Sequence, residues 1–211
     1  MLAQIVLFDG FDPLDVIAPY EVLAAGGMFA EGAISAELVS AEGAREVPSG
    51  LDLLTLRATA ALDPARADLI VVPGAAGRIS GEDSEIPAIL ARTLGTELPG
   101  LLGQALADPT VTVTTVCGGS LLLAMAGLIN GRPATTHHMG LAQLGELGPI
   151  AIDARVVDDG DLISAAGVTS GLDLGLYLVE RELGPGVALA VEQLMEHLRR
   201  GPVWQAAGAR A

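Results

Sequence analysis

The sequence predicts an open α/β fold, in which helices cover both faces of a mostly parallel β-sheet. Apolar, β-branched segments alternate along the chain with amphipathic ones, as strands and helices do in βαβ units. Hydrophobic residues make up 51% of the chain and aromatic residues only 3%. The core must therefore be aliphatic, which is typical of parallel strands buried between helices. The chain has 211 residues and no linker-like stretch, so we expect one domain spanning residues 1–211.

The first half of the chain begins with a buried strand over residues 3–8. Asp12 before Pro13 is a helix-start signal, and apolar residues at helical spacing predict a helix that ends at about Ala25. Further strands are expected over residues 34–41, 51–56, 68–72 and 111–116. The last of these follows a helix over residues 87–107 that is broken near Gly95 and Pro99.

The second half continues the alternation with a helix that begins after Cys117 and extends to Leu128. A short strand is expected over residues 134–136, ending at His137. Asp159-Gly160 is a two-residue hairpin turn between two strands. The remaining elements are helices over residues 141–147, 169–183 and 187–199, and the hairpin strands over 155–158 and 161–164.

Cys117 is the only cysteine and lies where the strand at 111–116 changes into a helix-forming run. A tight strand-to-helix turn exposes a nucleophile and needs small neighbours, and Gly118-Gly119 follow directly. The N–H groups at the start of that helix favour thiolate over thiol. The alternative is a small buried hydrophobe, which needs no glycine pair. We therefore interpret Cys117 as a functional thiol.

Other polar groups are expected at the same edge of the sheet, because ligands of open α/β folds bind beyond the carboxyl ends of the strands. Asp12 and Asp15 follow the first strand, and Gly74 and Ala75 follow the strand at 68–72. His137 follows the strand at 134–136. The sequence thus predicts that an acid, backbone amides and a histidine gather around Cys117.

Each of these residues also has a simpler explanation. Asp15 is either a catalytic acid or a favourable charge in a first helical turn. Gly74 either makes a turn or offers its amide to an oxyanion. His137 is a partner of Cys117 or an ordinary hydrogen-bonded histidine. Ser120 and Thr169 are further candidates for lining the cleft.

Composition excludes several classes of partner. A formal net charge of −15 repels nucleic acid and anionic membranes. The adjacent His137 and His138 would face opposite sides of a strand, so no metal site is expected. One cysteine cannot form an internal disulfide, and the N-terminus lacks a basic signal region. These observations predict a cytoplasmic protein that does not bind nucleic acid or membrane.

Four segments resemble the ThiJ/PfpI (DJ-one) superfamily, and the match spans nearly the whole chain. They are residues 11–23, 71–74, 115–120 and 131–137. The resemblance implies a flavodoxin-like three-layer sandwich of the class I glutamine amidotransferase type. It further implies a protein that needs no cofactor and forms a homodimer. It also implies that Cys117 is the nucleophile and Asp15 the acid beside it. The amides of Gly74, Ala75 and Gly118 would form the oxyanion hole.

Within the superfamily, the Leu14-Asp15-x-x-x-Pro19 opening and the segment 134–137 are most similar to isonitrile hydratases and to the ligand domains of certain transcription regulators. Two positions depart from the hydratases, which carry a hydroxyl residue at Gly118 and an aromatic residue at His138. The resemblance implies that the partner is a small electrophile and that the thiol adds to it with proton transfer by Asp15. Conversion of an isonitrile to an N-substituted formamide is the most specific reaction of this kind. Glyoxalase-type action on reactive aldehydes and non-catalytic redox or ligand sensing by the same cysteine are the alternatives.

Overall fold

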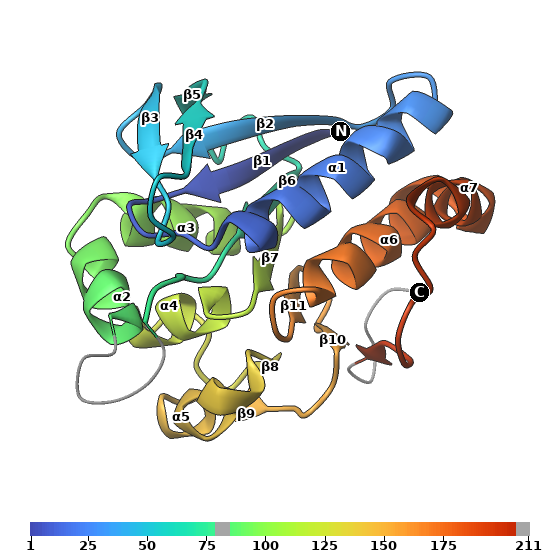
Figure 1. Cartoon of the computed structure of the whole chain (residues 1–211). Helices are drawn as coiled ribbons and strands as arrows, with labels where there is room; N and C mark the ends of the chain where they lie inside the picture. Colours follow the sequence, from blue (N-terminus) through green and yellow to red (C-terminus); the bar gives the residue numbers. More distant parts are fainter. Residues whose placement is uncertain (79–84, 206–211) are drawn as a thin grey trace.

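The computed structural model describes residues 1–78 and 85–205, and its centre is an eight-stranded sheet (Figure 1). The strands are β1 (Leu2–Leu7), β2 (Ser35–Ser40), β5 (Ala60–Ala61), β6 (Leu69–Val72), β7 (Thr112–Val116), β10 (Val156–Asp158), β11 (Leu162–Ala165) and β12 (Trp204–Gln205). Their order is β12-β10-β11-β7-β6-β1-β2-β5. Only the β10–β11 pair is antiparallel, which confirms the mostly parallel sheet.

Helices cover both faces of the sheet and make the fold three-layered (Figure 1). On one face lie α1 (Pro13–Phe29), α6 (Ser170–Leu183) and α7 (Pro185–Met195). On the other lie α2 (Ile86–Leu94), α3 (Leu98–Ala107) and α4 (Gly119–Met125), with α5 (Leu141–Glu146) beyond α4. The core between the layers is aliphatic, as the composition predicts: β6 is buried along its whole length.

Helix α1 is longer than the expected helix because Gly26 and Gly27 continue it instead of ending it. A Cβ on Gly26 would lie 2.7 Å from Val179 of α6, and one on Gly27 would lie 2.2 Å from the carbonyl oxygen of Ile34. Both glycines are therefore present for close packing. This packing holds α1, and the acid in its first turn, firmly against the sheet and α6.

The strand expected at residues 51–56 begins only at Thr55 and lies outside the central sheet. Antiparallel strands β3 (Arg45–Pro48) and β4 (Thr55–Ala58) form a separate hairpin, and residues 51–54 lie in its turn. Leu53 has a φ of +68° and is fully exposed. The run of leucines resembles a buried strand in composition, although the structure leaves it at the surface.

The strand expected at residues 134–136 is also not part of the central sheet. It is β8 (Pro133–Ala134), which pairs only with β9 (Ile150–Ala151). His137 consequently does not follow a strand of the main sheet. It is brought to the site by other contacts, described below.

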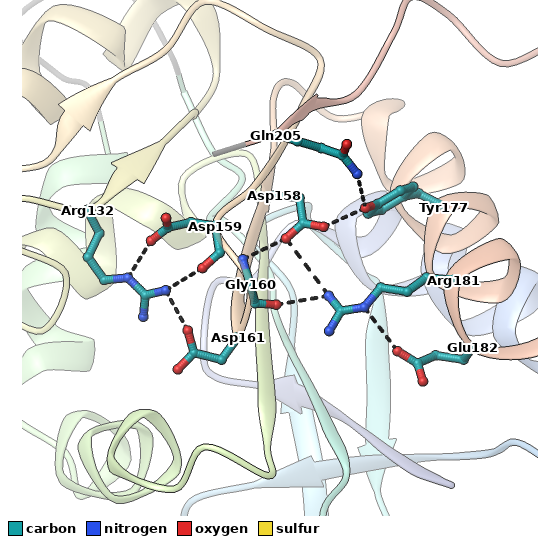
Figure 2. Close-up of polar contacts among 9 residues, drawn as sticks. All are labelled: Arg132, Asp158, Asp159, Gly160, Asp161, Tyr177, Arg181, Glu182 and Gln205. Carbon is teal, nitrogen blue, oxygen red and sulfur yellow. Dashed lines mark hydrogen bonds and ion pairs between the residues drawn. The ribbon is translucent and has the colours of Figure 1, made fainter. Parts of the chain in front are cut away.

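The predicted hairpin turn between β10 and β11 is present, with Gly160 at a φ of +88°. Figure 2 shows the polar contacts around it. Arg132 binds Asp159 at 2.6 Å and Asp161 at 2.5 Å, and Arg181 donates to the carbonyl of Gly160. A second set of contacts joins this turn to α6 and β12, through Tyr177 Oη to Asp158 at 2.5 Å and Gln205 to Tyr177.

Across residues 1–78 and 85–205, no helix is both long enough and apolar enough to span a bilayer. Nor do three or more His, Cys, Asp or Glu side chains gather there in a way that could hold a metal ion.

Candidate active site

Cys117 occupies a strained turn directly after β7. Its φ is +54°, a region that non-glycine residues rarely adopt. Hydrogen bonds hold it in this conformation from both sides: its N–H donates to the carbonyls of Ala165 and Ala166, and its carbonyl accepts from Thr136 Oγ1 at 2.6 Å. The residue is 8% exposed, so Cys117 is largely, but not wholly, enclosed.

Glycines let the turn pack against the end of β6. A Cβ on Gly119 would lie 2.3 Å from the carbonyl oxygen of Val72, and one on Gly74 would lie 2.5 Å from the Gly118 nitrogen. Side chains at these two positions are therefore excluded. Gly118 is different, because a Cβ there would meet Gly74 Cα at an ordinary 3.5 Å.

Asp15 is fully buried in the first turn of α1, which Asp12 caps by accepting from the Leu14 N–H. The Gly74 N–H donates to Oδ2 of Asp15 at 2.9 Å, and Oδ1 has no hydrogen-bond partner among the described residues. Burial raises the pKa of Asp15 well above its ordinary value, and the charge of Asp12 adds to this. The Gly74 amide and the Cys117 thiol act in the opposite direction.

Burial also raises the pKa of the Cys117 thiol, and the negative charge of Asp15 raises it further. The amides of Gly118 and Val168, which face the sulfur, do not compensate. The direction is opposite to the one expected from the helix start: α4 has only seven residues, and burial, together with the neighbouring carboxylate, outweighs its N–H groups. Since two like charges in contact cannot both be held in a buried site, the pair retains at least one proton at neutral pH.

The expected oxyanion hole needs a correction at Gly74, because its N–H is already bonded to Asp15. The Ala75 N–H has no acceptor in the parts of the chain that are described, and its nitrogen lies 3.8 Å from where a Gly118 Cβ would be. Ala75 and Gly118 therefore remain as donors. Val168 joins them, and it was missed because it lies in an irregular segment with no sequence signal.

Ser120 does not line a cleft. It is fully buried below the turn, and its Oγ lies 2.5 Å from Thr115 Oγ1. His137 begins the short 3₁₀ turn η1 (His138–Gly140), where its Nδ1 accepts from the Met139 N–H. Burial lowers the pKa of His137, and the charge of His138 acts in the same direction.

A cavity of about 390 Å³ adjoins the turn, and His137 and Thr169 both line it. Its wall includes Thr136, which bonds to the Cys117 carbonyl, and Val168, whose amide faces the sulfur. The cavity is within the size range of small-molecule sites. Cys117 and Asp15 do not themselves line this cavity, and it reaches the cysteine turn through Thr136 and Val168.

A three-layer α/β fold with a cysteine on a strained strand-to-helix turn beside a buried carboxyl places the chain among α/β proteins that carry a side chain on a strand-to-helix elbow. The chain belongs to the DJ-1/PfpI family, whose sequence profile matches residues 1–181. This confirms the resemblance found in the sequence.

Individual relatives agree with this assignment. The chain is 32% identical over 197 residues to the isonitrile hydratase of Pseudomonas putida, covering 93% of this chain and 78% of the relative. A ThiJ/PfpI family protein from Pseudomonas syringae is similar in structure, with a TM-score of 0.76 and 26% identity over 95% of this chain and 76% of that one. An AraC family transcriptional regulator from Pseudomonas putida has a TM-score of 0.69 and 25% identity, covering 92% of this chain and 98% of that one.

Proposed function

We propose that this protein is a cysteine-dependent hydratase of small electrophiles, and specifically that it converts isonitriles to N-substituted formamides without a cofactor. The observation that carries the proposal is that Cys117, on its strained turn, lies next to the buried carboxyl of Asp15: the Gly118 nitrogen and Asp15 Oδ2 lie 2.5 Å and 2.9 Å from the same point beside Gly74. The similarity to an isonitrile hydratase over 93% of the chain supports the choice of substrate.

In the first step, the sulfur adds to the terminal carbon of the isonitrile. An S–C bond forms, and the proton shared by Cys117 and Asp15 moves to the same carbon, so that R–N≡C becomes the thioimidate R–N=CH–S–Cys117. Asp15 is suited to this transfer because Oδ1 has no other partner, while Oδ2 is fixed by Gly74.

In the second step, water adds to the thioimidate carbon. Asp15 accepts one proton from the water and passes it to the nitrogen, which leaves R–NH–CH(OH)–S–Cys117. The C–S bond then breaks, the hydroxyl proton moves to the sulfur through Asp15, and R–NH–CHO leaves. The net reaction is the addition of one water to R–N≡C. During these steps negative charge develops on the sulfur or on the groups attached to the reacting carbon. The N–H groups of Ala75, Gly118 and Val168 can donate hydrogen bonds to that charge.

The raised pKa values of Cys117 and Asp15 favour this reaction over redox sensing by Cys117. Addition to an isonitrile consumes both a sulfur nucleophile and a proton, which a thiol–carboxyl pair supplies together. Rapid oxidation by peroxide instead needs a low-pKa thiolate, whereas burial and Asp15 raise the pKa of Cys117. The pair therefore favours hydration.

The test is formation of the formamide from an alkyl isonitrile by the purified protein, followed by NMR. Turnover should be lost in Cys117→Ala and kept in Arg57→Lys, which changes an exposed residue away from the site. Turnover that persists in Cys117→Ala would disprove the proposal. Lactate formation from methylglyoxal, with no action on isonitriles, would select the aldehyde alternative.

From the superfamily resemblance we also propose a homodimer. The mass in solution, measured by light scattering during size-exclusion chromatography, tests this independently of activity.

A further inference from the structure

Resting on the function proposed above, we propose that Arg155, together with His137, forms a subsite for a carboxylate, so that the preferred electrophiles are small acids whose carboxylate lies a few bonds from the reacting carbon. The proposal rests on the orientation of the Arg155 guanidinium, its place on the cavity beside Cys117, and the N–H groups it leaves unpaired.

A buried carboxylate, Asp173, and an exposed hydroxyl, Thr169, orient the Arg155 side chain, which is 21% exposed. Its Nε binds Oδ2 of Asp173 at 2.6 Å, and its Nη2 donates to Thr169 Oγ1 at 3.1 Å. Asp173 is itself fixed, because its Oδ1 accepts from the Arg200 N–H at 2.9 Å and lies 3.2 Å from His197 Nε2. The third nitrogen, Nη1, has no partner in the described parts of the chain. The guanidinium is therefore held in place with one end available to a ligand.

The backbone connects Arg155 directly to the cysteine turn. The Ala166 N–H donates to the Arg155 carbonyl at 3.0 Å, and the Ala166 carbonyl accepts from the Cys117 N–H at 2.8 Å. Thr169, which binds the guanidinium, follows Val168, whose amide faces the sulfur. Val168, Thr169 and Arg155 line the same cavity. The guanidinium therefore lies in the same cavity wall as Val168 and Thr136, the two residues that contact the cysteine turn, although Cys117 itself does not line the cavity.

His137 supplies a second donor. Because its Nδ1 accepts from the Met139 N–H, the neutral ring carries its proton on Nε2. The ring lies against Gly167, where a Cβ would be 2.7 Å from Cδ2 and 3.3 Å from Nε2. Gly167 and His137 both line the cavity.

The N–H groups of Arg155 and His137 are suited to bind a ligand group with two acceptor oxygens, such as a carboxylate. The cavity offers N–H groups from Arg155 and His137, while its one carboxylate, Asp153, is exposed on the rim. Hydrogen bonds from a guanidinium to a carboxylate are about twice as strong as those between neutral groups. An acid is therefore favoured over the corresponding ester, although Asp173 balances the formal charge of Arg155.

The test uses isocyanoacetate and its methyl ester, which differ in the carboxylate. We expect the wild-type protein to have a kcat/KM at least about tenfold higher for the acid. Arg155→Lys keeps a cation beside Asp173 but loses the second terminal nitrogen, and it should reduce this preference about tenfold. Arg57→Lys, a matched change of an exposed arginine, should leave the preference unchanged. Equal rates for acid and ester in the wild type, or equal losses for both in Arg155→Lys, would overturn the proposal.

Binding separates this subsite from the proposed reaction. In the Cys117→Ser protein, the dissociation constant of N-formylglycine, measured by titration calorimetry, should be about tenfold lower than that of its methyl ester. Arg155→Lys in the same background should remove this difference. If no isonitrile is converted, the proposed function fails, but this measurement still decides the subsite. Equal affinity for acid and ester would refute the subsite even if isonitriles are hydrated.

Discussion

The Gly74 amide donates a hydrogen bond of 2.9 Å to Oδ2 of Asp15. This contact joins the end of β6 to the first turn of α1 and fixes the carboxyl group beside Cys117. Oδ1 is left without a partner, so Asp15 has one oxygen for position and one for proton transfer. In the proposed reaction, Gly74 is a positioning residue for Asp15, and the sulfur and the acid act together.

Replacing Asp15 should change the pKa of the Cys117 thiol and the turnover rate in ways that can be measured separately. Asp15→Asn removes a negative charge that raises the pKa of Cys117, so the pKa of the thiol should fall. Iodoacetamide should then modify Cys117 several-fold faster at pH 8, since a lower pKa means more thiolate. Isonitrile turnover should fall at least about 100-fold, because the proton carrier is lost. Alkylation and turnover that both decline would show that Asp15 does not govern the thiol.

Two neighbouring glycines provide a matched pair for testing the packing of the site. A Cβ on Gly74 would lie 2.5 Å from the Gly118 nitrogen and 2.9 Å from Asp15 Oδ2, whereas a Cβ on Gly118 meets nothing closer than 3.5 Å. Gly74→Ala should lower the free energy of unfolding by about 1–3 kcal/mol and displace Asp15, with loss of turnover. Gly118→Ala should unfold at nearly the wild-type denaturant midpoint. Urea unfolding of both variants tests this, and equal stability would contradict it.

The hydroxyl of Thr136 should matter for the cysteine turn. Thr136→Val removes its 2.6 Å hydrogen bond to the Cys117 carbonyl, which helps hold the positive φ. We expect a loss of about 1–3 kcal/mol together with reduced kcat. Thr135→Val removes a hydrogen bond to the Ala154 carbonyl, and it should lose stability but keep turnover. A normal kcat in Thr136→Val would show that the turn does not depend on this bond.

Stability at high pH should depend on Tyr177. Burial, and then its bond to Asp158, raise the pKa of Tyr177 to about 12. The folded state thus favours the neutral phenol, and this stabilisation is complete below the ordinary pKa of about 10 and is lost as the pH rises to about 12. The chain has no lysine, but Cys117, whose pKa is also raised, contributes to the same loss of stability as the pH rises, so the share of Tyr177 is read from the difference between the wild type and Tyr177→Phe.

Urea unfolding at pH 9 and pH 11.5 checks the role of Tyr177. The free energy of unfolding of the wild type should drop between these values, and Tyr177→Phe should show a smaller drop. Tyr20→Phe removes the other tyrosine hydroxyl and should behave as the wild type. If Tyr177→Phe and wild type respond equally to pH, the Asp158 contact does not contribute in this way.

Local patterns predicted much of this molecule. The change from β-branched residues to Gly118-Gly119 places Cys117 on a turn, and the alternating segments predict the parallel sheet. Composition predicts the wrong structure for residues 51–54. Their leucines are typical of a buried strand, but these residues form an exposed turn. The strand at 134–136 is real in part, although its pairing with β9 outside the main sheet depends on contacts far along the chain.

The electrostatics of the site could not be predicted from sequence. The start of a helix after Cys117 suggests an acidic thiol, but burial and contact with Asp15 reverse this direction. The Gly74 N–H donates to Asp15, and the Val168 amide faces the sulfur. Both contacts arise because three segments far apart in the sequence meet in the fold. Neither residue type carries a signal for such a role.

The central claim is that Cys117 forms a covalent bond to the substrate carbon with the help of Asp15. Rapid mixing with an alkyl isonitrile, acid quenching and intact-mass measurement test it most directly. The protein should gain the mass of one isonitrile within a single turnover, on the peptide that contains Cys117, and Cys117→Ala should gain nothing and form no formamide. Formamide produced at the wild-type rate by Cys117→Ala, with no mass added to the wild-type protein, would contradict the account.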